Sequence, residues 1–151
     1  MPLEALLAWL HFVCIFALVG TLISEVALYR RHMDLARLMT LRRVDAWYGI
    51  SAGLVVISGI LRVAFGVKGA AFYLHNPIFW TKMGFFIALG LLSIPPTIHY
   101  IRLASRADAS GAVTVDDGGY RRMWVLLGVE LVLLACIPLW AALLAAGLSA
   151  L

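Results

Sequence analysis

Four long apolar stretches separated by short polar segments dominate this sequence. They cover residues 3–29, 44–67, 77–101 and 123–148. Each stretch is long enough to cross a bilayer, because an α-helix spans the hydrocarbon layer with about 20 residues. A backbone inside lipid must satisfy its own hydrogen bonds, which excludes an open sheet. The sequence therefore predicts an all-α fold, an integral membrane four-helix bundle.

The composition supports a membrane protein with one domain over residues 1–151. Of the 151 residues, 64% are apolar and 13% are charged, whereas a soluble domain is about a quarter charged. A soluble domain of this size cannot bury so much apolar surface, because its surface-to-volume ratio is too high. Residues 1–10 contain Glu4 and no Lys or Arg, so no secretory signal peptide is expected there.

The basic residues predict the orientation of the chain. Most of them flank or fill the first and third connections: Arg30, Arg31, Arg37, Arg42, Arg43, Arg102, Arg106, Arg121 and Arg122. The second connection holds only Lys68. By the positive-inside rule the arginine-rich connections face the cytoplasm, which gives an N-out/C-out topology. Because these residues follow the connections and form no single basic face, no nucleic-acid partner is expected.

Local motifs add further expectations. Asn76-Pro77 is a typical helix start, and residues 30–43 have room for a short amphipathic helix. Gly49 and Gly53 form a G-x-x-x-G motif, which lets helices approach closely. We expect it to pack inside the bundle, and pairing of two copies of the chain as a homodimer is the alternative.

Aromatic residues are expected at the cytoplasmic interface: Trp47, Tyr48, Tyr100 and Trp124.

Ionisable side chains inside a membrane are costly and usually mark functional sites. At about 1.5 Å per residue, His11 lies about 12 Å and Lys82 about 7 Å below the outer ends of their helices. Arg62 lies near the outer end of the second stretch. We expect these three residues to meet at one level of the bundle. The alternatives are a structural hydrogen-bonded pair of His11 and Lys82, and an Arg62 side chain that extends to the interface.

A second polar group is expected nearer the cytoplasmic side: Glu25, Asp45, His99 and Glu130. His11 and Glu25 are fourteen residues apart, so they project within about 40° of each other on a helix. That face should point inward. The alternatives are a pairing of Glu25 with an arginine of residues 30–43, a surface ion pair for Asp45, and a His99 that extends to the interface.

His11 is the candidate metal ligand, because a deep imidazole facing a bundle interior is well placed to bind haem iron. Arg62 and Lys68 would then receive the haem propionates. The sequence offers no second histidine at a matching depth. The opposite iron ligand would be Lys82, another residue, or none.

Three groups of motifs carry a resemblance to known families. Trp9-Leu10-His11 and Tyr29-Arg30-Arg31 begin and end the first stretch, and Phe79-Trp80-Thr81-Lys82-Met83 and His99-Tyr100-Ile101-Arg102 begin and end the third. Tyr120-Arg121-Arg122 leads into the last stretch, which holds Glu130 and Pro138. With these motifs the chain resembles a bacterial family of predicted four-helix membrane proteins of unknown function. More distantly, it is similar to the HemJ-type protoporphyrinogen oxidases and related copper-resistance membrane domains.

The resemblance to HemJ proteins implies that His11 and Lys82 bind haem b. The leading hypothesis is therefore a haem b protein of the bacterial cytoplasmic (inner) membrane. It would be an oxidoreductase that acts on a tetrapyrrole, as in protoporphyrinogen oxidation, or on a quinone-like electron partner. Lys82 would bind iron or act on substrate, and Arg62 would bind a carboxylate. Glu25 and Glu130 would form a proton route from the cytoplasm.

Two other classes of function stay open at this point. In a small transporter or ion-pathway protein, Glu25, Glu130 and Lys82 would line a channel, and Pro95-Pro96 would break the third helix to expose backbone carbonyls. In an accessory subunit of a larger complex, Gly49 and Gly53 would pack against the partner. The buried ionisable residues would then be structural pairs.

Overall fold

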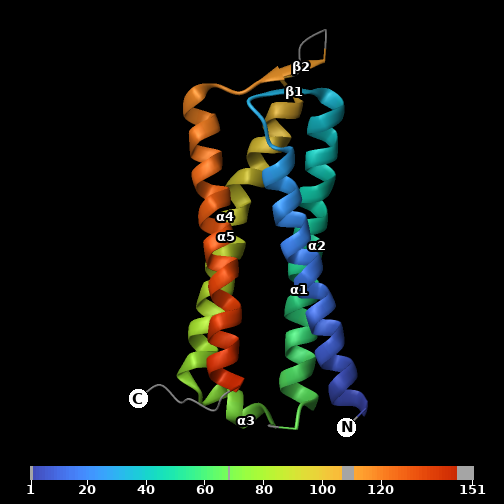
Figure 1. Cartoon of the computed structure of the whole chain (residues 1–151), viewed down its shortest axis with the longest axis vertical. Helices are drawn as coiled ribbons and strands as arrows, with labels where there is room; N and C mark the ends of the chain where they lie inside the picture. Colours follow the sequence, from blue (N-terminus) through green and yellow to red (C-terminus); the bar gives the residue numbers. More distant parts are fainter. Residues whose placement is uncertain (1, 68, 107–110, 146–151) are drawn as a thin grey trace.

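The computed structural model describes residues 2–67, 69–106 and 111–145. Its elements are α1 (Pro2–Leu28), β1 (His32–Asp34), α2 (Leu35–Phe65), α3 (Gly69–Leu74), α4 (Pro77–Ala104), β2 (Ala112–Thr114) and α5 (Asp117–Ala145). Helices α1, α2, α4 and α5 are long and apolar enough to cross a membrane. Figure 1 shows them running side by side, and α1 packs mainly on α2 and α4 on α5. The predicted all-α four-helix membrane bundle is confirmed.

Each long helix turns one stripe of side chains toward the interior. In α1 the buried residues recur every three or four positions: Leu7, His11, Cys14, Leu18, Leu22 and Glu25. This is the spacing of one helix face, and α5 repeats it with Met123, Leu127, Glu130, Leu134 and Ile137. His11 and Glu25 thus share the inward face, as predicted. The outward faces expose large apolar side chains such as Phe16 and Leu91, which suits contact with lipid.

Two helices extend well beyond their apolar stretches. Helix α2 begins at Leu35 and not at residue 44, and α5 begins at Asp117 and not at residue 123. With 31 residues, α2 is about 46 Å long at about 1.5 Å per residue, against about 30 Å of hydrocarbon. Its arginine-rich first turns can therefore stand outside the hydrocarbon. The expectation of a separate amphipathic helix in residues 30–43 is wrong. The second half of that segment is continuous with α2.

Side-chain caps fix the starts of two helices. The Asp34 carboxylate accepts a hydrogen bond from the Arg37 N–H at 2.8 Å and begins α2. The Asn76 side chain accepts one from the Ile78 N–H at 2.9 Å, so the predicted helix start at Asn76-Pro77 is confirmed.

Helix α4 continues through Pro95 and Pro96, so the predicted break there is wrong. Each proline removes one backbone donor, but membrane helices tolerate this where neighbouring groups compensate. Next to the prolines, Oγ1 of Thr97 lies 3.1 Å from the carbonyl oxygen of Ser93. Because α4 is continuous at this point, it does not expose the unwound backbone carbonyls that the transporter alternative requires.

Strands β1 and β2 pair antiparallel at one end of the bundle, with Met33 opposite Val113. Both of these side chains are buried. Figure 1 shows the strands at one end and α3 at the other. The sequence did not predict the strands, but their pairing confirms that the first and third connections lie at the same end. That this end faces the cytoplasm stays a prediction.

The G-x-x-x-G motif lies on the outside of the bundle. Gly49 and Gly53 are exposed, and a Cβ added at either would meet nothing within 4 Å. The expectation that they pack inside the bundle is therefore wrong. The alternative, that the exposed motif pairs two copies of the chain as a homodimer, stays a prediction.

Candidate functional site

His11 anchors the first polar level, which we name the outer level and define as His11, Arg62 and Lys82. Its side chain is 6% exposed, and its Nδ1 lies 2.8 Å from Oγ of Ser58 on α2. The Ser58 hydroxyl also lies 2.7 Å from the Leu54 carbonyl. Its single proton goes to that carbonyl, so Ser58 accepts from an Nδ1–H of His11. This assigns the lone pair to Nε2, the form of imidazole that binds metals.

Two cationic side chains complete the outer level. Arg62 from α2 and Lys82 from α4 are both partly buried, and their charges act on His11. Among the residues that the structure describes, neither forms an ion pair with a carboxylate. The three residues predicted to meet are thus brought together from three helices. Lys68, the other residue predicted to receive propionates, lies outside the described residues.

Three carboxyl groups form a second level, which we name the inner level: Glu25, Asp45 and Glu130. Glu25 on α1 is 2% exposed and Glu130 on α5 is 1% exposed, whereas Asp45 on α2 is partly buried. Their charges act on one another. Asp45 accepts a hydrogen bond from the Thr97 hydroxyl of α4 at 2.8 Å. Within the described part of the chain, none of the three forms an ion pair, so neither the Glu25–arginine pairing nor the surface ion pair of Asp45 is present.

Two buried tyrosines face these carboxyl groups, Tyr48 facing Glu130 and Tyr100 facing Glu25. The Tyr100 hydroxyl and one oxygen of each glutamate are buried without a hydrogen bond of normal geometry. Both side chains thus point into the bundle and not toward lipid, and their level at the cytoplasmic interface stays a prediction. Tyr48 follows Asp45 by three residues, a spacing that puts both on one helix face. That spacing was the sequence signal for its position.

His99 stands apart from the inner level. Its Nε2 lies 3.2 Å from the Tyr29 hydroxyl. Tyr29 in turn stacks on Tyr120, with ring centroids 5.5 Å apart. The charged groups that act on His99 are those near the strands, chiefly Asp116, Arg106 and Arg122. His99 therefore belongs to an aromatic cluster between the carboxyl groups and the strands.

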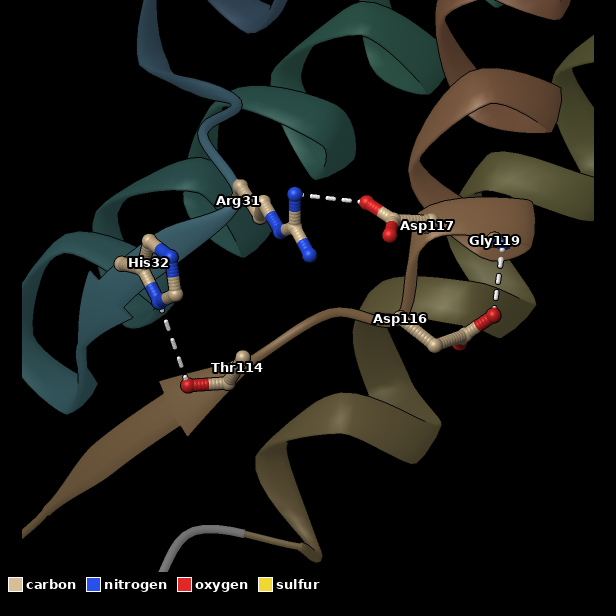
Figure 2. Close-up of polar contacts among 6 residues, drawn as sticks. All are labelled: Arg31, His32, Thr114, Asp116, Asp117 and Gly119. Carbon is tan, nitrogen blue, oxygen red and sulfur yellow. Dashed lines mark hydrogen bonds and ion pairs between the residues drawn. The ribbon is translucent and has the colours of Figure 1, made fainter.

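Figure 2 shows polar contacts that tie the strand end of the bundle together. Arg31 pairs with Asp117 at 2.6 Å, and Nδ1 of His32 lies 3.3 Å from Oγ1 of Thr114. The Asp116 carboxylate accepts a hydrogen bond from the Gly119 N–H at 2.9 Å. This bond holds the pKa of Asp116 below its ordinary value. These exposed contacts fasten β1 and the start of α5 and offer no reactive group of their own.

The two levels differ in chemistry. The outer level joins an imidazole to two cations and would favour an anionic ligand. The inner level joins three acids and would favour protons or cations. Across residues 2–67, 69–106 and 111–145, no group of three or more His, Cys, Asp or Glu side chains could by itself hold a metal ion. A metal bound to His11 would therefore bring ligands of its own.

Comparison with known proteins places the chain in a family. Searches of curated proteins and of solved structures gave no match, so the resemblance to HemJ-type oxidases stays a prediction. A family model described as "Predicted membrane protein (DUF2214)" matches residues 3–149, nearly the whole chain. The four apolar helices agree with that description. The chain belongs to the DUF2214 family of predicted membrane proteins.

Proposed function

We propose that this multi-pass membrane protein binds haem b through His11 and acts as an oxidoreductase on a tetrapyrrole or a quinone-like partner. The observation that carries the proposal is the buried His11 imidazole. Its Nδ1 is bonded to Ser58, and two cations without carboxylate partners lie beside it.

The donor atoms at the outer level fit haem. A histidine that binds a metal usually donates its other ring N–H to a nearby acceptor, which fixes the ring and its tautomer. Ser58 is such an acceptor for Nδ1 of His11. Gly59 lies beside the ring, and a Cβ there would be 3.5 Å from Cε1 of His11. The ring is therefore packed against backbone and held in place.

Arg62 and Lys82 supply the complementary charge. A cation that is partly buried without a counter-ion is costly in a membrane, and a carboxylate-bearing ligand would remove that cost. Haem carries two propionates, and an arginine binds a carboxylate through two parallel hydrogen bonds. In this proposal Arg62 binds a carboxylate, and Lys82 binds iron or acts on the substrate.

Bound haem would supply one-electron transfer. The residues of the chain would do the remaining work. His11 would hold the iron, Arg62 would bind a carboxylate, and Lys82, when neutral, would bind iron or would act on the substrate. Glu25 and Glu130 would exchange protons with the cytoplasmic side. The arginine-rich connections favour insertion in a cytoplasmic membrane with those connections inside. A bacterial inner membrane is the location that this proposal assigns.

The absorption spectrum of protein purified in detergent and supplied with haem tests the proposal. We expect a haem band in the wild type that is lost or shifted in His11→Ala. His75→Ala is the matched control, because His75 is exposed and its Nδ1 lies 2.8 Å from the carbonyl oxygen of Ala71 in the preceding helical turn. A band that is unchanged in His11→Ala would remove the ligand assignment, and a wild type that takes up no haem would refute the proposal.

A second candidate function is a proton or ion pathway, which the inner level favours. Three buried or partly buried carboxyl groups without ion pairs are typical of proton-conducting membrane proteins. Ion flux in vesicles tests this candidate. Flux that is present without haem and lost in Glu130→Gln would favour a pathway over an oxidoreductase.

A further inference from the structure

We infer that Glu25, Asp45 and Glu130 form a proton-binding site inside the membrane, which exchanges protons with the strand end of the bundle. This inference goes beyond the proposed function, because the site stands whether or not the protein binds haem. It adds to the proton roles proposed above a proton bound at rest and an entry point for it at Asp45.

The first argument is the convergence of three acids from three helices. Glu25 comes from α1, Asp45 from α2 and Glu130 from α5, and each carboxyl group is within range of the charge of another. Three ionised carboxylates this close together in a membrane would repel one another, and nearby like charges are one reason why an acid keeps its proton. The cluster therefore favours at least one bound proton.

The second argument is a set of buried polar atoms that lack partners. Within the described part of the chain, Oε1 of Glu25, Oε1 of Glu130 and the Tyr100 hydroxyl are buried without a hydrogen bond of normal geometry. An unpaired charge at such a position is costly. A protonated carboxyl gains an O–H donor that an ionised one lacks. Protonation would therefore remove the charge at these positions and let the carboxyl group donate as well as accept.

The side chains that face the site are mostly uncharged hydroxyls. From α4 the site is faced by Tyr100 and by Thr97, which donates to Asp45 at 2.8 Å. From α2 it is faced by Tyr48 and by the charge of Arg42 near Asp45. Arg42 forms no ion pair with any of the three acids in the described chain. Among the described residues the two glutamates thus form no ion pair, and a bound proton would remove their charge.

A proton fits the site better than a metal ion. The described residues contain no group of three or more His, Cys, Asp or Glu side chains that could hold a metal. Protons need only single oxygens within hydrogen-bonding reach of donors and acceptors, and the hydroxyls of Tyr48, Tyr100 and Thr97 provide these. Asp45 is the least buried of the three acids, so we assign it as the point of proton entry and exit.

Labelling with dicyclohexylcarbodiimide tests the site, because this apolar reagent attacks protonated carboxyl groups within membranes. The wild type in its native membrane would be treated at neutral pH and mapped by mass spectrometry. We expect label on Glu25 or Glu130 that is lost at high pH, and none on Glu4, an exposed carboxyl of the same chain. Infrared spectroscopy should show the carbonyl stretch of a protonated carboxyl, reduced in Glu25→Gln or Glu130→Gln.

Two outcomes would overturn the inference. The first is a wild type with neither label on the two glutamates nor a protonated-carboxyl band at neutral pH. The second is labelling that sodium or another metal ion blocks at constant pH, which would make the ligand a metal cation. Asp45→Asn should slow the exchange of the protonated-carboxyl band in D2O, and an unchanged rate would contradict its role as the entry point.

The same measurements in His11→Ala separate this inference from the proposed function. The protonated carboxyl groups should persist in that variant, because the inner level is built from other residues. Absence of haem in the wild type would refute the haem proposal and leave the labelling result unaffected.

Discussion

Nδ1 of His11 lies 2.8 Å from Oγ of Ser58, which joins α1 to α2 at the outer level. Ser58 also lies 2.7 Å from the carbonyl of Leu54 in its own helix. The serine therefore acts as a fixed acceptor for the imidazole N–H, and it is a positioning residue for His11.

Ser58→Ala should weaken haem binding more than it weakens the fold. Loss of a partner that orients a metal ligand lowers affinity by about 10-fold or more, and loss of one hydrogen bond between membrane helices costs about 0.6 kcal/mol on average. Haem titration followed by absorption measures the first effect, and unfolding in detergent measures the second.

Ser51→Ala is the matched control for Ser58→Ala, because Ser51 is buried on the same helix. We expect Ser51→Ala to retain wild-type haem affinity. Equal affinity in Ser58→Ala and wild type would show that the bond to His11 is structural only.

The hydrogen bond from Thr97 to Asp45 should couple α4 to α2 energetically. Thr97→Val keeps the shape of the side chain and removes the donor, whereas Thr97→Ser keeps the donor. A double-mutant cycle with Asp45→Ala, which removes the acceptor, should give a coupling of about 0.6 kcal/mol, the average for such bonds in membranes. The measurement is the free energy of unfolding in detergent for the two single variants and the double variant. Strictly additive effects would mean that the bond contributes nothing.

Gly49→Leu and Gly53→Leu should leave the monomer fold intact, because a Cβ at either glycine meets nothing within 4 Å. If these glycines pair two copies of the chain, the larger side chain will block close approach of the helices. The thermal midpoint of unfolding and the oligomeric state in detergent check the two statements. Gly59→Leu is the contrasting variant, because Gly59 lies against the His11 ring. A large loss of stability in Gly49→Leu would contradict its placement on the outer face.

The sequence predicts the parts of this fold that depend on periodicity and charge. Spacing alone puts His11 and Glu25 on one face of α1, and helix rise alone puts His11 near Lys82. Those inferences succeed because a membrane helix has fixed geometry and because charged groups avoid lipid. The sequence does not predict the start of α2 at Leu35, because the apolar stretch that defines the predicted helix begins only after Arg42 and Arg43. Outside the hydrocarbon, however, arginine and leucine are both good helix formers.

Other features depend on contacts that a single sequence does not contain. Pairing of Met33 with Val113 joins segments 80 residues apart, and nothing local marks either strand. The direction in which Gly49 and Gly53 face depends on which side of α2 the other helices cover. That Tyr100 is buried in the bundle depends likewise on which side of α4 the other helices cover, whereas the spacing from Asp45 indicates the face on which Tyr48 lies.

Asp116 should make the strand end of the bundle sensitive to acid. Its carboxylate accepts from the Gly119 N–H at 2.9 Å, and this bond holds its pKa below the ordinary value for an aspartate. A group whose pKa is lower in the folded state stabilises the fold above its unfolded pKa. That contribution is lost as the pH falls through the folded pKa.

Comparison of wild type with Asp116→Asn over acidic pH isolates this contribution, because the other carboxyl groups are common to both proteins. We expect the difference in unfolding free energy to be constant at neutral pH and to shrink below the usual range of aspartate titration. Asp117→Asn is the control, since Asp117 pairs with Arg31 and does not accept from Gly119. Gly119→Ala gives an independent check, because its Cβ would lie 2.9 Å from Oδ1 of Asp116 and displace the carboxylate. A difference between wild type and Asp116→Asn that does not change with pH would show that the charge of Asp116 has no part in holding the start of α5.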